Sequence, residues 1–157
     1  MLPDAALSFL LADETATAAF GARLASVIEP RLKIYLSGEL GSGKTTLVRG
    51  ALRALGYQGT VKSPTYTLVE IYRVSSLYLY HFDFYRLKHQ DEWDEAGFRE
   101  LFDDFGACLV EWPEQARDRL PEPDLVVTLE LQGNGRRIEV AARTDKGRQC
   151  VAQLAVR

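Results

Sequence analysis

The sequence predicts an α/β fold: one domain over residues 1–157, with a mixed, partly antiparallel sheet flanked by helices. Three observations support this prediction. Strand-like and helix-like segments alternate in the first third of the chain, as in a sheet with helices packed on it. Pairs of strand-like runs joined by short turns follow, which predicts antiparallel hairpins. The length of 157 residues, with 46% hydrophobic and 26% charged residues, is ordinary for a single globular domain.

The first four elements alternate between strand and helix. Residues 6–13 predict a short strand, and residues 14–28 predict a helix because apolar side chains recur at helical spacing. Asp13 is the expected N-cap of that helix. Residues 31–38 alternate and end in glycine, which indicates a second strand, and residues 44–55 predict a helix closed by the glycine that follows it.

The rest of the chain predicts two hairpins separated by helical material. Runs of β-branched and aromatic residues, together with short turns, indicate the hairpin strands. These strands are residues 65–74 with 76–85, and residues 124–131 with 136–143. Between the hairpins, the acidic stretch 89–102 predicts one helix, and residues 107–112 predict a short strand that stops before Pro113. For residues 146–156 the pattern leaves helix and strand open.

Charge and composition limit the classes of function. The formal net charge is -3, which argues against a free-standing nucleic-acid binder because phosphate neutralisation needs a basic surface. Cys108 and Cys150 lack CxxC spacing, and Cys108 lies in an apolar run, which favours a buried thiol in a reducing compartment. Residues 1–10 lack the basic start of a signal peptide, and no apolar run approaches the length of a membrane span. We therefore expect a cytoplasmic protein without a membrane segment.

The stretch SGELGSGKTTLVRG, residues 37–50, carries the strongest functional signal. Gly38, Gly43, Lys44 and Thr45 match the pattern G-x-x-x-x-G-K-[ST] between a predicted strand and a predicted helix. Glycines allow backbone N–H groups to turn inward and, with the helix N-terminus, to surround phosphates. We expect Lys44 to reach the β- and γ-phosphates and the Thr45 hydroxyl to bind Mg²⁺. The expected nucleotide-binding loop consists of Gly38, Glu39, Leu40, Gly41, Ser42, Gly43, Lys44, Thr45 and Thr46, the last of which contacts the α-phosphate or caps the turn.

With this motif, the expected fold is a single-domain P-loop NTPase. Two acids are candidates to complete its metal site. Asp83 and Glu111 each end an apolar strand-like run. A carboxylate at the end of a neighbouring strand usually helps to hold Mg²⁺ in such sites. Spacing does not decide which acid holds the metal and which orients water. His81 is either a donor to one of these acids or a structural histidine.

A Ser-Pro-Thr segment is a candidate sensor of the third phosphate. Ser63, Pro64 and Thr65 place hydroxyls on a restricted backbone between the P-loop helix and the Asp83 strand. Loop threonines in nucleotide switches read the γ-phosphate and the metal. The competing interpretation is an ordinary Ser-Pro turn that opens a strand.

Two other nucleotide-dependent classes fit less well. A guanine-specific GTPase would need an N-K-x-D motif, and none follows the weak D-x-x-G match at residues 94–97. A small-molecule kinase would need an acceptor site and several arginines on a closing lid. The candidate arginines are scattered, and they form no obvious lid in the sequence: Arg86, Arg99, Arg117 and Arg119. The kinase remains an alternative.

Four motifs in order resemble one family closely. SGELGSGKTTLVRG, VKSPTYTLVEIY, YHFDFYRL and LVEWPE are similar to the signatures of the TsaE (YjeE) family, over about residues 13–123. The resemblance implies a compact P-loop fold that binds ATP or ADP with Mg²⁺ and hydrolyses ATP slowly. It also implies a requirement in the threonylcarbamoyladenosine modification of adenosine 37 in ANN-decoding tRNAs. The family acts on a TsaD–TsaB complex, so tRNA is expected as an indirect partner only.

The resemblance also implies roles for individual residues. Lys44 and Thr45 keep the P-loop roles derived above, and Glu111 becomes the expected Mg²⁺ ligand. Asp83 becomes the candidate for organising water or metal during hydrolysis. Residues 63–67 become a switch-like segment in which Thr65 is the best sensor. The expected catalytic residues are therefore Lys44, Asp83 and Thr65.

Weaker correspondences concern the nucleotide's other contacts. Trp112 corresponds to a ring near the nucleotide or the partner surface, with core packing as the alternative. Asp13 and Thr15 are expected beside the adenine, and Arg136 is expected to reach the nucleotide, with surface solvation as the alternative for all three. Two mechanisms follow: a slow, partner-stimulated regulatory ATPase, or a nucleotide-dependent binding module without useful hydrolysis. We expect a monomer or weak self-association.

Overall fold

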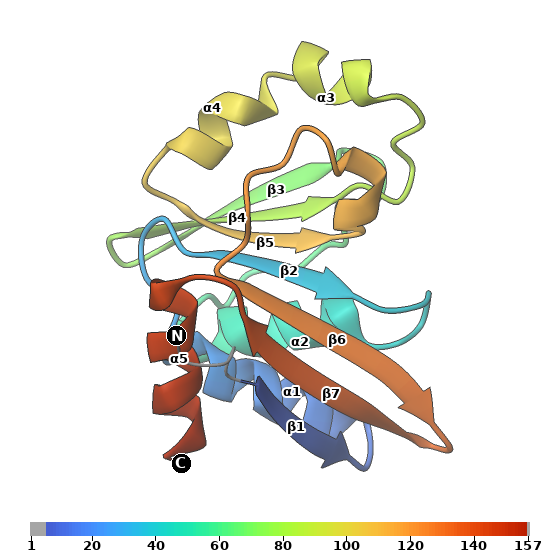
Figure 1. Ribbon diagram of the computed structural model, residues 1–157, viewed down its shortest axis with the longest axis vertical. Coiled ribbons are helices and arrows are strands. Elements are labelled where there is room, and N and C mark those ends of the chain that lie inside the picture. Colours follow the sequence, from blue (N-terminus) through green and yellow to red (C-terminus); the bar gives the residue numbers. More distant parts are fainter. Residues whose placement is uncertain (1–5, 157) are drawn as a thin grey trace.

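The computed structural model describes residues 6–156, which contain a seven-stranded mixed sheet with helices packed on it (Figure 1). The predicted α/β fold with a partly antiparallel sheet is confirmed. The sequence predicted no signal peptide at residues 1–10, and residues 1–5 of that stretch lie outside the described residues. Within residues 6–156, no helix has the length and apolar character needed to cross a membrane.

Parallel strands form the centre of the sheet and antiparallel strands form its margins. The strands are β1 (Ala6–Leu11), β2 (Lys33–Ser37), β3 (Val69–Val74), β4 (Leu77–Asp83), β5 (Ala107–Glu111), β6 (Leu125–Gln132) and β7 (Gly135–Ala142). Their order is β1-β7-β6-β2-β5-β4-β3. β2 runs parallel to β5 and β6, and β4 runs parallel to β5. The carboxyl ends of β2, β4 and β5 therefore meet at one edge, where open α/β sheets form their binding crevices.

Helices cover both faces of the sheet. They are α1 (Glu14–Ala25), α2 (Lys44–Ala54), α3 (Gln90–Glu95), α4 (Phe98–Asp103), α5 (Asp145–Ala155) and the 3₁₀ helix η1 (Pro113–Ala116). α3 and α4 lie beyond β3, β4 and β5, on the side away from α1 and α2 (Figure 1). Successive side chains of a strand point to opposite faces. On β2, Ile34 therefore enters the core under α1 and α2, whereas Tyr35 enters the aromatic core under α3 and α4.

Two glycines allow α1 and α2 to cross in close contact. A Cβ placed on Gly50 would lie 2.1 Å from the carbonyl oxygen of Ala18, and one on Gly21 would lie 2.2 Å from that of Leu47. Neither backbone oxygen can move away without shifting its helix. The crossing holds α2 against α1, and α2 is the helix that follows the P-loop.

The N-terminal predictions were largely confirmed. The backbone N–H of Ala16 donates to Asp13 Oδ1 at 2.8 Å, so Asp13 is the N-cap of α1. Gly56 follows α2 with a φ of 101°, a left-handed conformation that suits glycine. For residues 146–156 the sequence left helix and strand open, and the structure has a helix there, α5. Its N-cap Thr144 accepts from the backbone N–H of Gly147.

Several predicted boundaries were wrong; the helix predicted over residues 14–28, for example, ends at Ala25. The single helix over residues 89–102 is instead α3 and α4, because Gly97 adopts a φ of 73° between them. The strand predicted from residue 65 begins at Val69, after a turn. The strand predicted to reach Trp112 ends one residue earlier, because Trp112 adopts a φ of 57° and leaves the extended conformation.

We predict that replacing Gly50 with alanine destabilises the fold. Alanine normally stabilises a helix relative to glycine, but here the added Cβ overlaps the Ala18 carbonyl. Overpacking of this kind costs about 1–3 kcal/mol. Thermal unfolding monitored by circular dichroism should show a lower Tm for Gly50→Ala, and an unchanged or higher Tm would contradict the described crossing.

We predict that both thiols of the native protein resist alkylation. Cys108 and Cys150 are buried, and burial raises the pKa of Cys108 to about 12 and that of Cys150 to about 11. At pH 8 both thiols are therefore protonated and shielded, whereas the thiolate is the reactive form. A thiol-reactive chromophore should titrate two groups in denaturant and almost none in the native protein. Rapid native labelling of either cysteine would contradict this packing.

Candidate functional site

The glycines of the predicted P-loop have backbone conformations that suit glycine, and a close contact also requires one of them. Gly38, Gly41 and Gly43 have φ values of 152°, 77° and 106°. A Cβ on Gly38 would lie 2.6 Å from the carbonyl oxygen of Leu129, so no larger residue fits there without a shift. Gly43 is the N-cap residue of α2 and makes no side-chain cap, so the helix's first N–H groups remain directed at the loop.

Lys44 is the first residue of α2, directly after the loop glycine Gly43. Its Nζ donates to the carbonyl oxygen of Gly38 and lies 3.8 Å from the centroid of the Trp112 ring. Burial lowers the pKa of the Lys44 ammonium, and the nearby carboxylates of Glu111, Glu114 and Asp83 partly oppose this effect. The side chain is therefore a desolvated cation, which interacts strongly with any anion that enters the loop.

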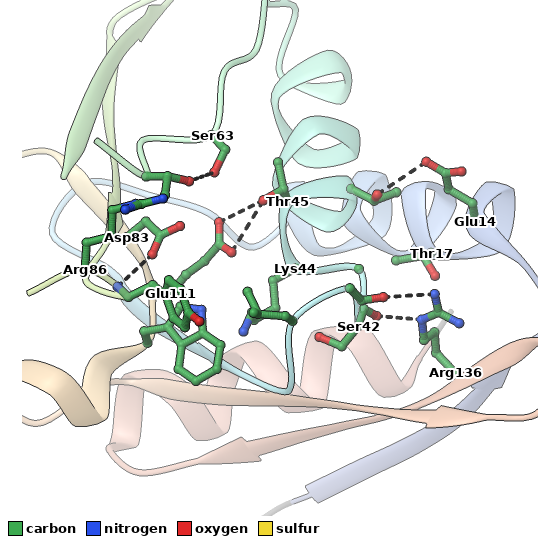
Figure 2. Close-up of a pocket in the computed structure, with 17 residues that line it drawn as sticks. Glu14, Thr17, Ser42, Lys44, Thr45, Ser63, Asp83, Arg86, Glu111 and Arg136 are labelled. Carbon is green, nitrogen blue, oxygen red and sulfur yellow. Dashed lines mark hydrogen bonds between the residues drawn. The ribbon is translucent and has the colours of Figure 1, made fainter. Parts of the chain in front are cut away.

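Thr45 faces the end of β5. Its hydroxyl Oγ1 lies 3.2 Å from Glu111 Oε2 and 3.4 Å from Glu111 Oε1 (Figure 2). Glu111 is only 3% exposed, and its Oε2 lies 2.5 Å from Nε2 of the fully buried His81. Between the two interpretations of His81, the contact favours a donor that orients the Glu111 carboxylate. A hydroxyl and a carboxylate fixed side by side provide the hard oxygen atoms that Mg²⁺ prefers.

Asp83 is the second acid at this edge. It is the register partner of Glu111 across the parallel pair of β4 and β5, and it is 5% exposed. Burial raises the pKa of the Asp83 carboxyl, and the Glu111 charge raises it further. The hydrogen bond that the Tyr85 N–H donates to Asp83 Oδ1, at 2.9 Å, lowers this pKa. Both acids thus end adjacent strands and point at the same pocket (Figure 2). The predicted convergence of the two acids on one site is therefore present, while their division of labour stays a prediction.

The switch-like segment forms a tight turn at the rim of the pocket. The hydroxyls of Ser63 and Thr65 are 2.9 Å apart, and both residues line the pocket (Figure 2). Pro64 is buried and accepts from the N–H of Leu68 at 2.8 Å, while the Leu68 carbonyl accepts from the N–H of Asp83 at 3.0 Å. Leu68 adopts a φ of 69°, a conformation that leucine rarely takes. The first bond closes the turn, and the second ties its Leu68 end to the strand that carries Asp83.

Arg136 crosses from β7 to the other side of the loop. Its Nε donates to the Ser42 carbonyl at 2.7 Å, and its Nη2 donates to the Gly41 carbonyl at 3.2 Å (Figure 2). Residue 136 thus lines the pocket and also supports the loop from outside, while its contact with a nucleotide stays a prediction. Trp112 lines the pocket as well and packs against the Tyr85 ring at 4.9 Å between centroids.

These residues enclose one cavity of about 550 Å³, which is large enough for a nucleotide-sized ligand. Of the predicted site residues, it includes Leu40, Gly41, Ser42, Gly43, Lys44, Thr45, Thr46, Thr65, Asp83, Glu111, Trp112 and Arg136. Gly38 and Glu39 form the base of the loop outside the lining, and Asp13 and Thr15 also lie outside it. The Asp13 side chain caps α1 and does not line the cavity. The first turn of α1 lines it with Glu14 and Thr17.

Sequence reasoning did not place Glu14, Thr17 or Tyr85 in the site, and it considered Arg86 only as part of a kinase lid. Glu14 and Thr17 reach the pocket because α1 packs along α2, and Glu14 lies 3.5 Å from the Thr46 hydroxyl. No motif marks these positions. Tyr85 and Arg86 directly follow the Asp83 strand, and their place after an acid at a strand end was the available signal.

Comparisons with known proteins find similar chains of one family. The family model described as "Threonylcarbamoyl adenosine biosynthesis protein TsaE" matches residues 11–138. The tRNA threonylcarbamoyladenosine biosynthesis protein TsaE of Haemophilus influenzae is 40% identical over 154 residues, covering 95% of this chain and 98% of that protein. The protein of the same name from Bacillus subtilis is 36% identical over 121 residues, covering 77% and 75%.

A solved structure matches the whole fold as well. The crystal structure of Bacillus subtilis YdiB superposes with a TM-score of 0.85 at 27% sequence identity, covering 99% of this chain and 98% of that one. The family model covers the P-loop, both acids and Arg136. The chain therefore belongs to the TsaE family.

Proposed function

We propose that this protein is an ATP hydrolase that supports threonylcarbamoyladenosine modification of tRNA by acting on a TsaD–TsaB type complex. Family membership and the names of its relatives support the role in this modification. The observation that carries the hydrolase activity is the convergence of Lys44, Thr45, Asp83 and Glu111 on one cavity. In these residues a phosphate-binding loop meets two buried carboxylates at the ends of adjacent strands.

The donor set fits Mg²⁺ as a cofactor. Thr45 and Glu111 would hold the ion, with Asp83 as the nearest further carboxylate. Residues 6–156 contain no group of three His, Cys, Asp or Glu residues arranged to hold a metal, and Mg²⁺ in phosphate sites usually binds one or two carboxylates together with substrate oxygens. When bound, Mg²⁺ neutralises charge on the β- and γ-phosphates of the substrate.

The protein's own residues then have distinct tasks. The N–H groups of the P-loop and the Lys44 ammonium hold the phosphates in the desolvated pocket, where charge interactions are strong. Asp83 accepts a hydrogen bond from the attacking water and orients it toward the γ-phosphorus. Thr65, beside Ser63 on the rim, changes its contacts when the γ-phosphate is present or absent. Hydrolysis thereby resets the conformation of the turn that a partner reads.

The arrangement of arginines gives less support to a small-molecule kinase. Arg119 pairs with Asp91 and Asp94, and the Arg99 guanidinium lies over the Trp93 ring. Arg117 lines a different cavity, near Pro121 and Arg143. In the described residues, no set of arginines surrounds a second anionic substrate next to the P-loop. The net charge of -3 agrees with indirect contact with tRNA, through the assembled complex.

We predict that Lys44→Ala and Glu111→Gln each abolish useful hydrolysis. Loss of one preorganised electrostatic contact typically lowers kcat by about 10²–10³-fold. Phosphate release by the protein with its TsaD–TsaB partner, and tRNA modification in a reconstituted reaction, should both fall. Lys88→Ala, at an exposed lysine outside the pocket, is the matched control and should retain activity. Near-normal rates in both site variants would exclude this assignment.

We predict that Asp83→Asn separates binding from hydrolysis. Asparagine keeps an oxygen that accepts from the Tyr85 N–H but loses the charge that orients water. ATP affinity measured by calorimetry should change little, whereas the single-turnover rate should fall by about 10²-fold or more. Asp103→Asn, on the exposed end of α4, serves as the control. If Asp83→Asn lost hydrolysis yet fully restored tRNA modification in cells, the protein would be a nucleotide-dependent binding module instead.

A further inference from the structure

Arg86 occupies a rigidly placed turn directly after the catalytic candidate Asp83. The flanking residues Phe84 and Leu87 are buried, at 0% and 4% exposure, and the N–H of Leu87 donates to the Phe84 carbonyl at 3.0 Å. The N–H of Phe84 donates to the Glu111 carbonyl at 3.1 Å, which ties the turn to β5. The backbone of Arg86 is thus held beside both acids, while its long side chain remains exposed.

The Arg86 guanidinium is the least committed cation of the cavity. Lys44 contacts the Gly38 carbonyl, and Arg136 donates to two carbonyls of the loop and to that of Gly135 in β7. Arg86 instead lies over the ring of Tyr66, at 4.3 Å from its centroid, and Nη2 donates to the Tyr66 hydroxyl at 3.2 Å. No other hydrogen bond of this side chain is present in the described part of the chain. Most of its five N–H donors therefore remain available to a ligand.

Tyr66 belongs to the switch-like turn and is 80% exposed. Its neighbour Thr65 lines the cavity, so the contact of Tyr66 with Arg86 joins the rim turn to the edge that carries Asp83 and Glu111. A cation–π contact at an exposed site is worth only about 0.5–1 kcal/mol. Arg86 can therefore leave Tyr66 at small cost in free energy when an anionic group binds in the cavity.

Phosphoryl transfer needs positive charge where this side chain lies. In ATP hydrolysis the water oxygen forms a bond to the γ-phosphorus while the bond from that phosphorus to the bridging oxygen breaks. ADP leaves with the electron pair, and the water's proton passes to the released phosphate or to solvent. Negative charge on the transferring group is stabilised by a guanidinium, which accelerates related reactions by about 10³–10⁵-fold. Two buried carboxylates stand on this side of the cavity, which increases the need for a cation.

We infer that Arg86 is a catalytic residue of the hydrolysis, an arginine supplied by the same chain that contacts the γ-phosphoryl oxygens in the transition state. This inference rests on the proposed hydrolase function. Tyr66 holds the guanidinium away from the phosphates in the resting protein. Because the Tyr66 ring is exposed, a partner protein that covers it competes with Arg86 for that ring. Partner binding thereby releases the arginine and raises turnover.

The test compares Arg86→Ala and Arg86→Lys with Arg99→Ala, whose arginine lies over Trp93 outside the cavity. We expect both Arg86 variants to lower kcat by about 10²-fold or more, with KM and ADP affinity changed less than about threefold. Lysine does not rescue, because it lacks the planar fork that contacts two oxygens. Tight binding of Mg·ADP with aluminium fluoride, which mimics the transferring group, should be lost in both Arg86 variants and kept in Arg99→Ala.

A second variant tests the resting contact. Tyr66→Ala should raise partner-independent turnover, and Tyr66→Phe, which keeps the ring but not the hydroxyl, should raise it less. Undiminished kcat and retained aluminium fluoride binding in Arg86→Ala would overturn this inference alone, while Lys44→Ala still lost activity. Unchanged or lower turnover in Tyr66→Ala would overturn the holding role of Tyr66. Absence of hydrolysis in the wild-type protein with its partner would overturn the proposed function and this inference together.

Discussion

The contact between the Thr45 hydroxyl and the Glu111 carboxylate is the interaction on which the site depends. It joins the first turn of α2 to the end of β5, and these elements are 66 residues apart in the chain. Parallel pairing of β2 with β5 brings them together, because both strands then end at the same edge of the sheet. The glycine crossing of α1 and α2 and the bond from His81 hold the two partners in place.

The cavity concentrates charge in a poorly solvated place. Lys44, Asp83 and Glu111 are each at most 5% exposed, and burial lowers the pKa of Lys44 and raises that of Asp83. The attraction between Lys44 and the two acids offsets part of the cost of burial, as the opposing influences on the pKa of Lys44 indicate, whereas the two acids repel each other. Such an arrangement stabilises the fold little, since buried ion pairs rarely gain more than their desolvation costs. It is well suited to receive a polyanionic substrate and a divalent ion, which supply the missing partners.

Local signals in the sequence predicted the parts of the structure that local chemistry determines. The P-loop glycines, the Asp13 cap and the hairpin strands follow from residue types at fixed spacing. The left-handed Leu68 was missed because residue type gives no signal for a positive φ at leucine. The division of one predicted helix at Gly97 was missed although glycine often ends a helix. The positions of Glu14 and Thr17 in the cavity depend on how α1 packs along α2. That packing is decided by contacts between distant segments, which single-sequence patterns do not contain.

Calorimetric titration of the protein with ATP, with and without Mg²⁺, tests the central claim most directly, because it asks whether the loop and the two strand ends form one nucleotide site. We expect saturable uptake of one ATP per chain, with markedly higher affinity when Mg²⁺ is present. The absence of measurable adenine nucleotide binding under either condition would contradict it.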